Sequence, residues 1–403
     1  MTQPARTQRV WVLIVVFGML VAFGPLTIDL VLPFLPELQS DLEIDPASAQ
    51  LIVTGATFGF AAGQLIAGPL SDAVGRRAPL AVAAALHIIS SVVAASTSDL
   101  AILLPARFTQ GAACTAAGVV VVAIVRDLYS GRRLATMLAN LAVVASVTPI
   151  LVPTIGAQLT KIMEWRGSFV VVAVWGTVAT ILAMWILPET LPREKRHPGG
   201  IGPSLRNSFG MLRRPRLLAL AAASSAGWAI GFGYLATAPL LYVRVFELGP
   251  DAYGLMFMLA AAITITASQF SGRLLIQRLG GRRVLRVSGI TTIVGAAAIV
   301  ASALAGWSSL AVVVGVFTLA LAGRSIGMPA VQYLSLQGPA HEGASVTAIL
   351  GAISFTVAGL VMPPMGAFAE VSLVPYGMLV ALGACIMLAV PLIRWPEPTA
   401  RGG

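Results

Sequence analysis

The sequence predicts an all-α membrane protein with twelve transmembrane helices arranged in two six-helix halves. Its 403 residues are 57% hydrophobic and only 10% charged, whereas soluble domains carry about 25% charged residues. The mean hydropathy is +0.89, and apolar runs of about 20 residues, the length that crosses a bilayer, recur along the whole chain. The two cysteines, Cys114 and Cys385, lie in apolar runs of different halves and predict neither a disulfide nor a metal site.

The apolar runs define twelve predicted spans, each long enough to cross the hydrocarbon core at about 1.5 Å per residue. The first run is not expected to be a cleaved signal peptide, because it is too long, carries Asp29 and is not followed by a small-residue cleavage site. The predicted spans are 10–38, 47–70, 78–97, 100–126, 134–159, 167–187, 216–243, 252–273, 284–304, 307–335, 344–369 and 372–394.

The positions of the 26 basic residues predict the orientation of these spans. If the N-terminus is cytoplasmic, 21 of the 26 lie in the tails and the inner loops, and only Lys161, Arg166 and Arg244 lie in the outer loops. Cytoplasmic loops of membrane proteins carry such an excess of Lys and Arg. The net charge of +10 is therefore a topology signal in a cytoplasmic-membrane protein, and nucleic-acid binding is not expected.

A polar stretch rich in Pro, Gly and Arg divides the chain in two. We predict an N-terminal bundle over 1–188, a basic cytoplasmic linker over 189–215 and a C-terminal bundle over 216–403. The two sides echo each other at offsets of 204 and 206 residues, which indicates parallel six-helix repeats, a pattern of secondary transporters. The echoing strings are Gly68-Pro69-Leu70 with Gly75-Arg76-Arg77 and Gly272-Arg273-Leu274 with Gly281-Arg282-Arg283.

Asp29 is the one acidic residue of sixteen that is predicted to lie deep in a span. An ionised Asp there costs about 2.5–3.5 kcal/mol on insertion scales, and low dielectric favours its neutral form. Pro25, Pro33 and Pro36 remove helical hydrogen bonds around it, and such loose backbone is tolerated only against protein or a wet cavity. Asp29 is therefore a candidate proton carrier, with a plain packing hydrogen bond or ion pair as the alternative.

Arg107, in span four, is the expected counterpart of Asp29. Both residues lie seven or eight positions from the outer ends of their spans, which is roughly 10–12 Å deep. A positive neighbour favours the charged form of an acid, so a substrate that disturbs the pair would change its proton affinity. A static structural pair is the alternative.

Several chemistries have no counterpart in the sequence. There is no phosphate-binding loop for ATP hydrolysis, no H-E-x-x-H pair and no nucleophile elbow. Ionisable residues inside the spans are isolated rather than clustered, which argues against an enzyme or a sensor. We expect no enzymatic activity and no cofactor, with the proton as coupling ion.

Two strings carry a resemblance to a known family. Gly68-Pro-Leu-Ser71-Asp72-Ala-Val-Gly75-Arg76-Arg77 resembles the G-x-L-x-D-x-x-G-R-R signature of major-facilitator transporters, and Arg107-Phe-Thr-Gln110-Gly111 resembles the proton-coupling motif of their drug antiporters. The chain is most similar to the Bcr/CflA group of bacterial drug:proton antiporters, along nearly its full length. That likeness is carried by residues 25–36, Gly63-Gln64-Leu65, Arg126-Asp127-Leu-Tyr129 and Glu189-Thr-Leu-Pro192.

The resemblance implies roles that spacing alone does not give. It makes Asp29 the protonatable acid, and it makes the residues at the inner end of spans two and four a cytoplasmic latch that holds the outward-facing state. In that latch Asp72 is expected to face the positive N-terminal end of span eleven, and Asp127 to pair with nearby arginines. The latch residues are Gly68, Asp72, Gly75, Arg76, Arg77, Arg126 and Asp127.

Span five departs from the family pattern. The antiporter motif G-P-x-x-G-G is here Val152-Pro153-Thr154-Ile155-Gly156-Ala157, with Pro149 upstream. A kink and close packing are still expected from Pro149, Pro153 and Gly156, whereas a tight seam of several glycines is in doubt.

The remaining candidates lie outside the family pattern. Arg324 in span ten needs a partner or water and is a candidate for substrate binding or coupling. Trp228 and Phe232, one turn apart in span seven, with Tyr234 on another face, are candidates for a drug-binding wall, although lipid-facing packing explains them equally well. His87 in span three is more typical of a packing residue than of a proton relay.

The expected function is proton-coupled efflux of small organic drugs or antibiotics by alternating access, by a monomer in the bilayer of the cytoplasmic membrane. The alternative on the same fold is a proton-coupled importer or facilitator of a small metabolite. Phenicols, bicyclomycin-like compounds, sulfonamides and a metabolite of the producing cell all remain open as substrates.

Overall fold

A computed structural model describes residues 10–196, 201–306, 309–337, 342–369 and 371–393. Arg6 and Arg9 of the basic N-terminus lie outside the described residues, as do residues 197–200 of the predicted linker. Within the described ranges the chain is helical and has no strand, in agreement with the predicted fold class.

Within the described residues, twelve helical spans are long and apolar enough to cross a membrane, and each coincides with one of the twelve predicted segments. The sequence pattern therefore located every span correctly, with shifts of a few residues at most of the ends. The spans are Trp11–Asp41, Pro46–Val74, Arg77–Ser96, Leu100–Leu128, Gly131–Leu159, Trp165–Ile186, Pro215–Val245, Pro250–Leu279, Gly281–Leu304, Leu310–Ser335, Gly343–Phe368 and Val374–Leu392.

Nine spans are single helices or end in a short helical turn, and three are broken. The unbroken helices are α4 (Pro46–Val74), α5 (Arg77–Ser96), α6 (Leu100–Leu128), α7 (Gly131–Leu159), α8 (Trp165–Ile186), α13 (Gly281–Leu304), α14 (Leu310–Ser335), α15 (Gly343–Phe368) and α16 (Val374–Ala389), the last followed by η6 (Val390–Leu392). Span seven joins α10 (Pro215–Leu240) to a π-helical turn η3 (Leu241–Val245), and span eight joins α11 (Pro250–Phe270) to a π-helical turn η4 (Ser271–Leu275) and α12 (Ile276–Leu279). Between the halves lie η2 (Arg193–Lys195) and α9 (Ile201–Met211).

Span one is the most irregular, as its prolines predict. It runs through α1 (Val10–Val21), α2 (Phe23–Ile28), the 3₁₀ turn η1 (Leu32–Phe34) and α3 (Leu35–Asp41). Asp29 caps the C-terminal end of α2, and the N–H of Val31 bonds to the carbonyl of Ile28 at 3.2 Å instead of continuing the α-helical pattern. The break therefore falls at the one deeply placed acid of the sequence.

Glycines in a left-handed conformation end the two spans that the sequence echo relates. Gly75 follows α4 with φ of +103°, and Gly280 follows α12 with φ of +75°. A helix can continue through polar residues as long as its backbone hydrogen bonds are formed. Accordingly, α4 extends past the end predicted at residue 70, and span eight extends past the end predicted at residue 273. The structural counterpart of Gly75 is Gly280, one residue before the Gly281 that the sequence echo suggested.

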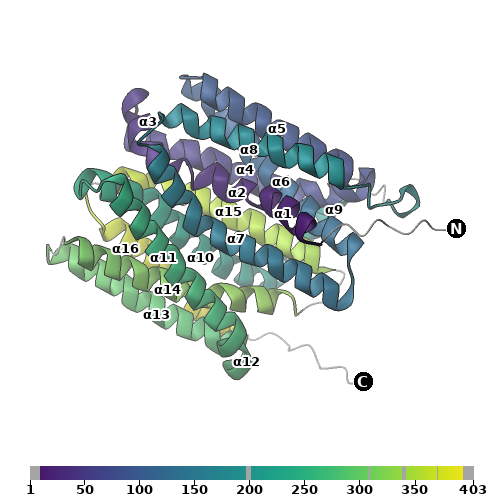
Figure 1. The fold of residues 1–403 in the computed structure, drawn as a ribbon. Helices are drawn as coiled ribbons and strands as arrows, with labels where there is room; N and C mark the ends of the chain where they lie inside the picture. Colours follow the sequence, from purple (N-terminus) through teal and green to yellow (C-terminus); the bar gives the residue numbers. More distant parts are fainter. Residues whose placement is uncertain (1–9, 197–200, 307–308, 338–341, 370, 394–403) are drawn as a thin grey trace.

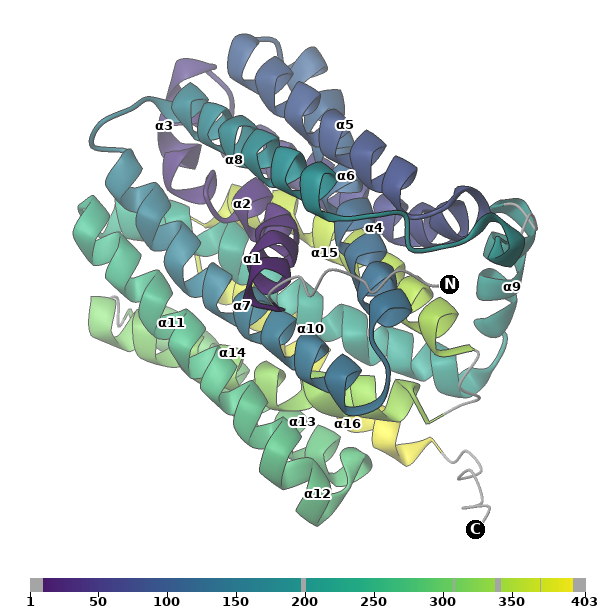
Figure 2. The same cartoon turned by 45° about the vertical axis from the view of Figure 1, so that its right-hand side comes forward.

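The helices of each half pack mainly against one another, and two pairs of helices make most of the contacts between the halves (Figures 1 and 2). Within the first half, α4 and α6 can approach closely because Gly59, Gly63 and Gly111 have no side chain. A Cβ at any of these positions would collide with the backbone of the facing helix. Between the halves, α15 packs on α4 and α11 packs on α7. A central space remains between the two bundles, and the candidate site lies there.

Candidate functional site

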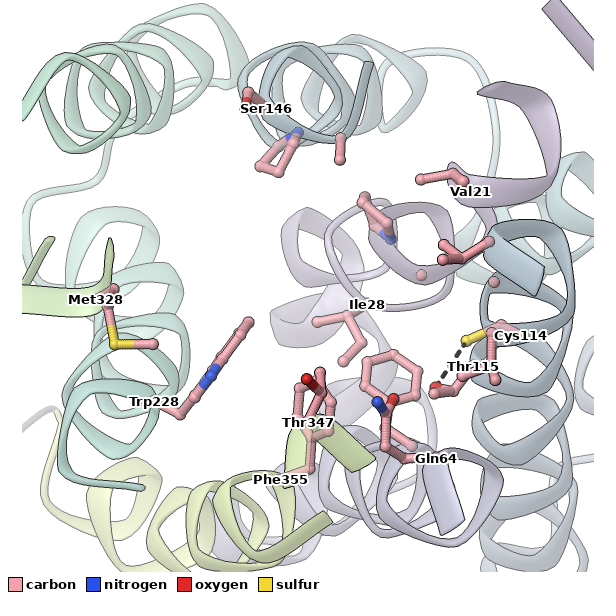
Figure 3. A pocket seen from close by; sticks show the side chains of 18 of the residues that line it. Val21, Ile28, Gln64, Cys114, Thr115, Ser146, Trp228, Met328, Thr347 and Phe355 are labelled. Carbon is pink, nitrogen blue, oxygen red and sulfur yellow. Dashed lines mark hydrogen bonds between the residues drawn. The ribbon is translucent and has the colours of Figure 1, made fainter. Parts of the chain in front are cut away.

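A large cavity of about 1020 Å³ lies between the two halves. Its lining comes from both, with Ile28, Gln64 and Thr115 on one side and Trp228 and Phe355 on the other, all facing a common space (Figure 3). The cavity reaches from Asp29 to the helix ends that carry Asp72, Arg126 and Ala344. We call this the basic end, because the arginine-rich loops lie there.

The end opposite the basic end is sealed by hydrogen bonds between the halves. Gln50 Nε2 donates to the carbonyl of Ala236 at 3.0 Å, and Thr54 Oγ1 donates to the carbonyl of Gly359 at 3.1 Å. On the second interface, Thr154 Oγ1 donates to the carbonyl of Gly254 at 3.2 Å. If the basic loops are cytoplasmic, as the positive-inside pattern predicts, the structure is an inward-open state.

Asp29 lies on the cavity wall and is 9% exposed. Within the described residues its carboxyl group forms no hydrogen bond and no ion pair. Tyr253 of α11 is close enough to interact with it electrostatically, and the buried hydroxyl of Tyr253 is itself without a hydrogen-bond partner in the described chain. The break at the end of α2 thus presents an unpaired acid to the cavity.

The expected ion pair between Asp29 and Arg107 is wrong. Arg107 is 0% exposed and does not line the cavity. Its Nη2 donates to the carbonyl of Thr27 at 2.8 Å, its Nε donates to the carbonyl of Ile52 at 3.0 Å, and its Nη1 donates to Gln110 Oε1. The N–H donors of Arg107, which were expected to pair with the carboxylate of Asp29, therefore bond to two backbone carbonyls and to the side-chain amide of Gln110.

A buried polar cluster continues from Arg107 through the N-terminal half. Gln110 Nε2 donates to Ser91 Oγ of α5 at 2.7 Å. His87 lies beside it, fully buried, with its ring stacked on Phe23 at 4.4 Å and its Nδ1 3.4 Å from the carbonyl of Gln110. His87 does not line the cavity, and this environment is that of a packing residue.

Four aromatic rings from three helices form one wall of the cavity. The ring of Trp228 lies 5.8 Å from Phe232 and 4.9 Å from Phe355, and Phe355 lies 5.3 Å from Phe60 of α4. Trp228 and Phe232 therefore face the cavity, and their role in binding stays a prediction. The sequence analysis missed Phe60 and Phe355, because periodicity does not separate a cavity-facing aromatic from a lipid-facing one.

Tyr234 also borders the cavity, but it is only 5% exposed. Its ring packs at 5.3 Å from Phe257 and 5.7 Å from Phe317. Its hydroxyl has no hydrogen-bond partner in the described residues.

Arg324 of α14 lines the cavity from the C-terminal half. Its Nη1 donates to the carbonyl of Gly227 at 3.1 Å, and its Nε is buried without a partner in the described chain. A Cβ at Gly231 would lie 3.0 Å from the guanidinium carbon, so this glycine leaves room for the guanidinium group against α10. No acidic side chain of the described residues pairs with Arg324.

At the basic end, Arg76 connects the ends of α4 and α6. Its Nη1 donates to Asp72 at 2.6 Å and to Ser71 Oγ at 2.9 Å, and its Nε donates to Asp127 at 2.9 Å. The pairing of Asp127 with a nearby arginine is thus present. Asp72 bonds to Arg76 within its own half and is 55% exposed at its side chain, so no described contact ties it to the N-terminus of α15 in this state.

Glu189 holds the turn between α4 and α5 from the side of the linker. Its carboxylate accepts the N–H of Arg76 at 2.9 Å and the N–H of Arg77 at 3.3 Å. Burial acts to raise the pKa of this carboxyl, but the backbone N–H donors outweigh it and leave the pKa below its ordinary value. Glu189 is therefore a charged anchor at the N-terminus of α5, where the helix dipole favours an anion.

The other predicted latch residues have separate surroundings. Arg77 Nη2 donates to the carbonyl of Met184, which ties α5 to α8. Arg126 is exposed and lines the cavity at the basic end. Gly68 also lines the cavity, and a Cβ there would meet nothing within 4 Å.

Pro149 and Pro153 of α7 line the cavity opposite the aromatic wall, and α7 continues as one helix through both. Gly156 lies against the break of span one, where a Cβ would come 2.8 Å from the carbonyl oxygen of Leu30. A single glycine is therefore enough to let α7 pack closely on the segment that carries Asp29.

Comparisons with known proteins agree with this architecture. The family model described as Major Facilitator Superfamily matches residues 14–363. The uncharacterized MFS-type transporter YdgK of Bacillus subtilis is 31% identical over 391 residues, which is 95% of each chain. The bicyclomycin resistance protein homolog of Haemophilus influenzae is 24% identical over 385 residues, 96% of each chain.

Solved structures share the same fold at low sequence identity. A bacterial homolog of the human lysosomal transporter Spinster superposes with a TM-score of 0.74 at 15% identity, covering 96% of this chain and 98% of the other. The overall arrangement of the helices is thus a fold shared with that structure. The chain belongs to the Major Facilitator Superfamily, and it is a multi-pass transporter of the cytoplasmic membrane rather than an enzyme.

Proposed function

We propose that this protein exports small organic compounds, antibiotics among them, in exchange for protons. The observation that carries the proposal is the unpaired carboxyl of Asp29, mostly buried on the wall of a large cavity with an aromatic face. An acid without a fixed partner can take up and release a proton, whereas an acid in a permanent ion pair is held in its charged form. The bicyclomycin resistance protein homolog among the relatives supports a drug as the cargo.

The exchange follows from competition at one site. In the inward-open state a compound enters from the cytoplasm, contacts the aromatic wall and displaces the proton from Asp29. After the halves rock to open the other end, an outside proton returns to Asp29 and releases the compound.

The proton gradient supplies enough free energy for this exchange. One charge moving through about 100 mV supplies about 2.3 kcal/mol, and one pH unit supplies about 1.4 kcal/mol. Together they sustain a gradient of a neutral compound of about 500-fold.

The cargo is found first by a growth-inhibition panel in a pump-deficient bacterium, with phenicols, bicyclomycin and sulfonamides in the panel. The same panel is run with Asp29→Asn, which keeps the size of the side chain but cannot bind a proton, and with Asp29→Glu, which can. We expect Asp29→Asn to abolish resistance and Asp29→Glu to retain part of it. Undiminished resistance with Asp29→Asn would refute the proton role.

Everted membrane vesicles with an imposed pH gradient separate export from import. An exporter accumulates the compound inside everted vesicles when the interior is acid, and compound movement releases protons from the interior. Accumulation in the opposite direction would establish a proton-coupled importer instead. Asp29→Asn vesicles serve as the control for passive leakage of the compound.

A further inference from the structure

We propose that the transported molecule is amphoteric, with a basic amine that pairs with Asp29 and an anionic group, such as a carboxylate, that pairs with Arg324. The proposal rests on the proposed function and specifies the class of its substrate. It starts from one juxtaposition: two opposite charges, one from each half of the molecule, line the same cavity, and neither has an ion-pair partner in the described chain.

No described acid of the C-terminal half forms an ion pair with Arg324. Its guanidinium has five N–H donors, and within the described chain only Nη1 has a hydrogen-bond partner, the carbonyl of Gly227. Among the acids after residue 215, Asp251 pairs with Lys161 and Glu342 with Arg214, and Glu247 lies in the loop after η3. Glu370 and Glu397 lie outside the described residues.

A guanidinium that is partly buried at the cavity wall favours an anionic partner. The desolvation of an unpaired charge is costly, and good geometry with a counter-charge offsets it. The planar fork of Arg binds carboxylate and phosphate oxygens in pairs. Gly231 leaves the space that the guanidinium occupies against α10, so the charge stays at the cavity wall, where a ligand can reach it.

Asp29 supplies the matching anion on the opposite wall. A ligand amine that pairs with its carboxylate uses the oxygens that would otherwise hold the proton, so the two bind in competition. Such competition is reciprocal, because each ligand weakens the other by the same factor. An amine at Asp29 is therefore the feature that makes uptake of the ligand release a proton.

A ligand with one charge fits the cavity less well. A cation alone leaves Arg324 without a counter-charge and is repelled by it. An anion alone favours the protonated form of Asp29. Ligand and proton would then bind together and move in the same direction, which suits import rather than exchange. A molecule with both charges satisfies both walls, and the rings of Trp228, Phe232 and Phe355 offer apolar contact between them.

The test uses four forms of one scaffold, so that only charge varies. For ciprofloxacin these are the parent compound with both charges, its methyl ester, its N-acetyl derivative and the doubly blocked form; tryptophan supplies the same four forms on a second scaffold. Binding to the detergent-solubilised full chain is measured by calorimetry at pH 7.5, without a proton gradient. The proteins are wild type, Arg324→Gln, Asp29→Asn and the exposed control Arg283→Gln.

We expect wild type and Arg283→Gln to bind the parent compound at least tenfold more tightly than either singly blocked form, on at least one scaffold. Tenfold corresponds to about 1.4 kcal/mol. Arg324→Gln should lose the preference for the free carboxylate and keep the preference for the free amine. Asp29→Asn should show the reverse pattern. Each variant thus serves as the folding control for the other.

Three results would overturn the proposal. The first is a wild type that shows no preference for the parent compound on either scaffold, which includes no binding at all. The second is an Arg324→Gln protein that binds every form equally weakly. The third is loss of the carboxylate preference in Asp29→Asn, which would mean that Arg324 acts only through an internal pair with Asp29. Because this assay uses no gradient, it can fail while Asp29-dependent resistance persists, or succeed while that resistance is absent.

Discussion

At the scale of single residues, Arg107 explains how the chain keeps a helix broken next to an acid. In a regular α-helix the N–H of Val31 would bond to the carbonyl of Thr27, but here it bonds to Ile28. The freed carbonyl of Thr27 accepts Nη2 of Arg107 at 2.8 Å. Arg107 also reaches the carbonyl of Ile52 in α4, so it fixes the broken segment against its neighbour. We infer that Arg107 positions Asp29 without pairing with it.

Arg107→Gln is therefore expected to destabilise the protein and to abolish transport. The shorter side chain leaves the buried carbonyl of Thr27 without a donor and removes the second donor of the Ile52 carbonyl, which still accepts its backbone N–H within α4. Lost hydrogen bonds of a charged donor cost about 1.5–3 kcal/mol each. The measurement is the unfolding midpoint of the solubilised protein, with Arg132→Gln, an exposed arginine at the start of α7, as the control. If Arg107→Gln unfolds like wild type while transport is lost, the positioning role is wrong and a direct role in coupling is favoured.

Depth and residue type were enough to predict which charged residues lie inside the spans. Asp29, Arg107 and Arg324 are the charged residues that the sequence places deep in spans, and two of them line the cavity. Their partners were not predictable, because one acceptor of Arg107, the carbonyl of Thr27, is free only where the N–H of Val31 bonds to Ile28 instead. Spacing along two helices gave equal depth for Asp29 and Arg107 but not the directions in which the side chains point.

At the scale of helices, the end of α4 shows how a motif divides into positions with different physical roles. Gly75 has φ of +103°, which L residues with a Cβ rarely adopt, and a Cβ there would lie 2.6 Å from Glu189 Oε2. The carboxylate that the Cβ would meet is the same one that holds the N–H groups of Arg76 and Arg77. Gly68 belongs to the same signature, yet it lies in regular helix beside open space.

Gly75→Ala is thus expected to lower stability, and Gly68→Ala is the matched control that should not. A residue with a Cβ in a strained backbone conformation costs about 1–3 kcal/mol, whereas Ala is favoured over Gly by about 1 kcal/mol inside a helix. Thermal unfolding of the two solubilised variants checks this difference in sign. Equal unfolding temperatures for both variants would show that the turn adapts and that Glu189 is not a tight anchor.

The sequence predicted the helices better than their ends. Hydropathy located all twelve spans, because the bilayer requires apolar side chains over a fixed length. It placed the end of span eight at 273, although helix continues to Leu279, since backbone bonding does not stop where apolar residues stop. The turn at Gly280 follows from backbone geometry, which hydropathy does not record.

At the scale of the whole molecule, the two halves meet through α4 with α15 and α7 with α11. The repeat in the sequence predicted two halves, but it gave no information on the state in which they meet. The seal opposite the basic end includes side-chain hydrogen bonds from Gln50, Thr54 and Thr154 to backbone carbonyls. At the end of α7 it also includes the exposed ion pair of Lys161 with Asp251. Each hydrogen bond is worth about 0.5–1.5 kcal/mol net and an exposed ion pair about 0–1 kcal/mol, so these polar contacts are weak enough to break during transport, and the sequence leaves the balance between states undetermined.

A disulfide across that seal is expected to lock the transporter with its cavity open to the basic end. A Cβ at position 254 would lie 3.6 Å from the Cβ of Thr154, within the range of about 3.5–4.5 Å that disulfides require. Thr154→Cys with Gly254→Cys, in a chain that also carries Cys114→Ser and Cys385→Ser, should therefore cross-link on mild oxidation. Because α7 and α11 belong to different halves, the bond prevents the seal from opening, so transport in vesicles should fall to the leak level and return on reduction.

Each single cysteine variant controls for oxidation without a cross-link and should keep its activity. Full transport by a demonstrably cross-linked protein would show that α7 and α11 do not separate in the cycle, and the seal would then have to open between α4 and α15 alone.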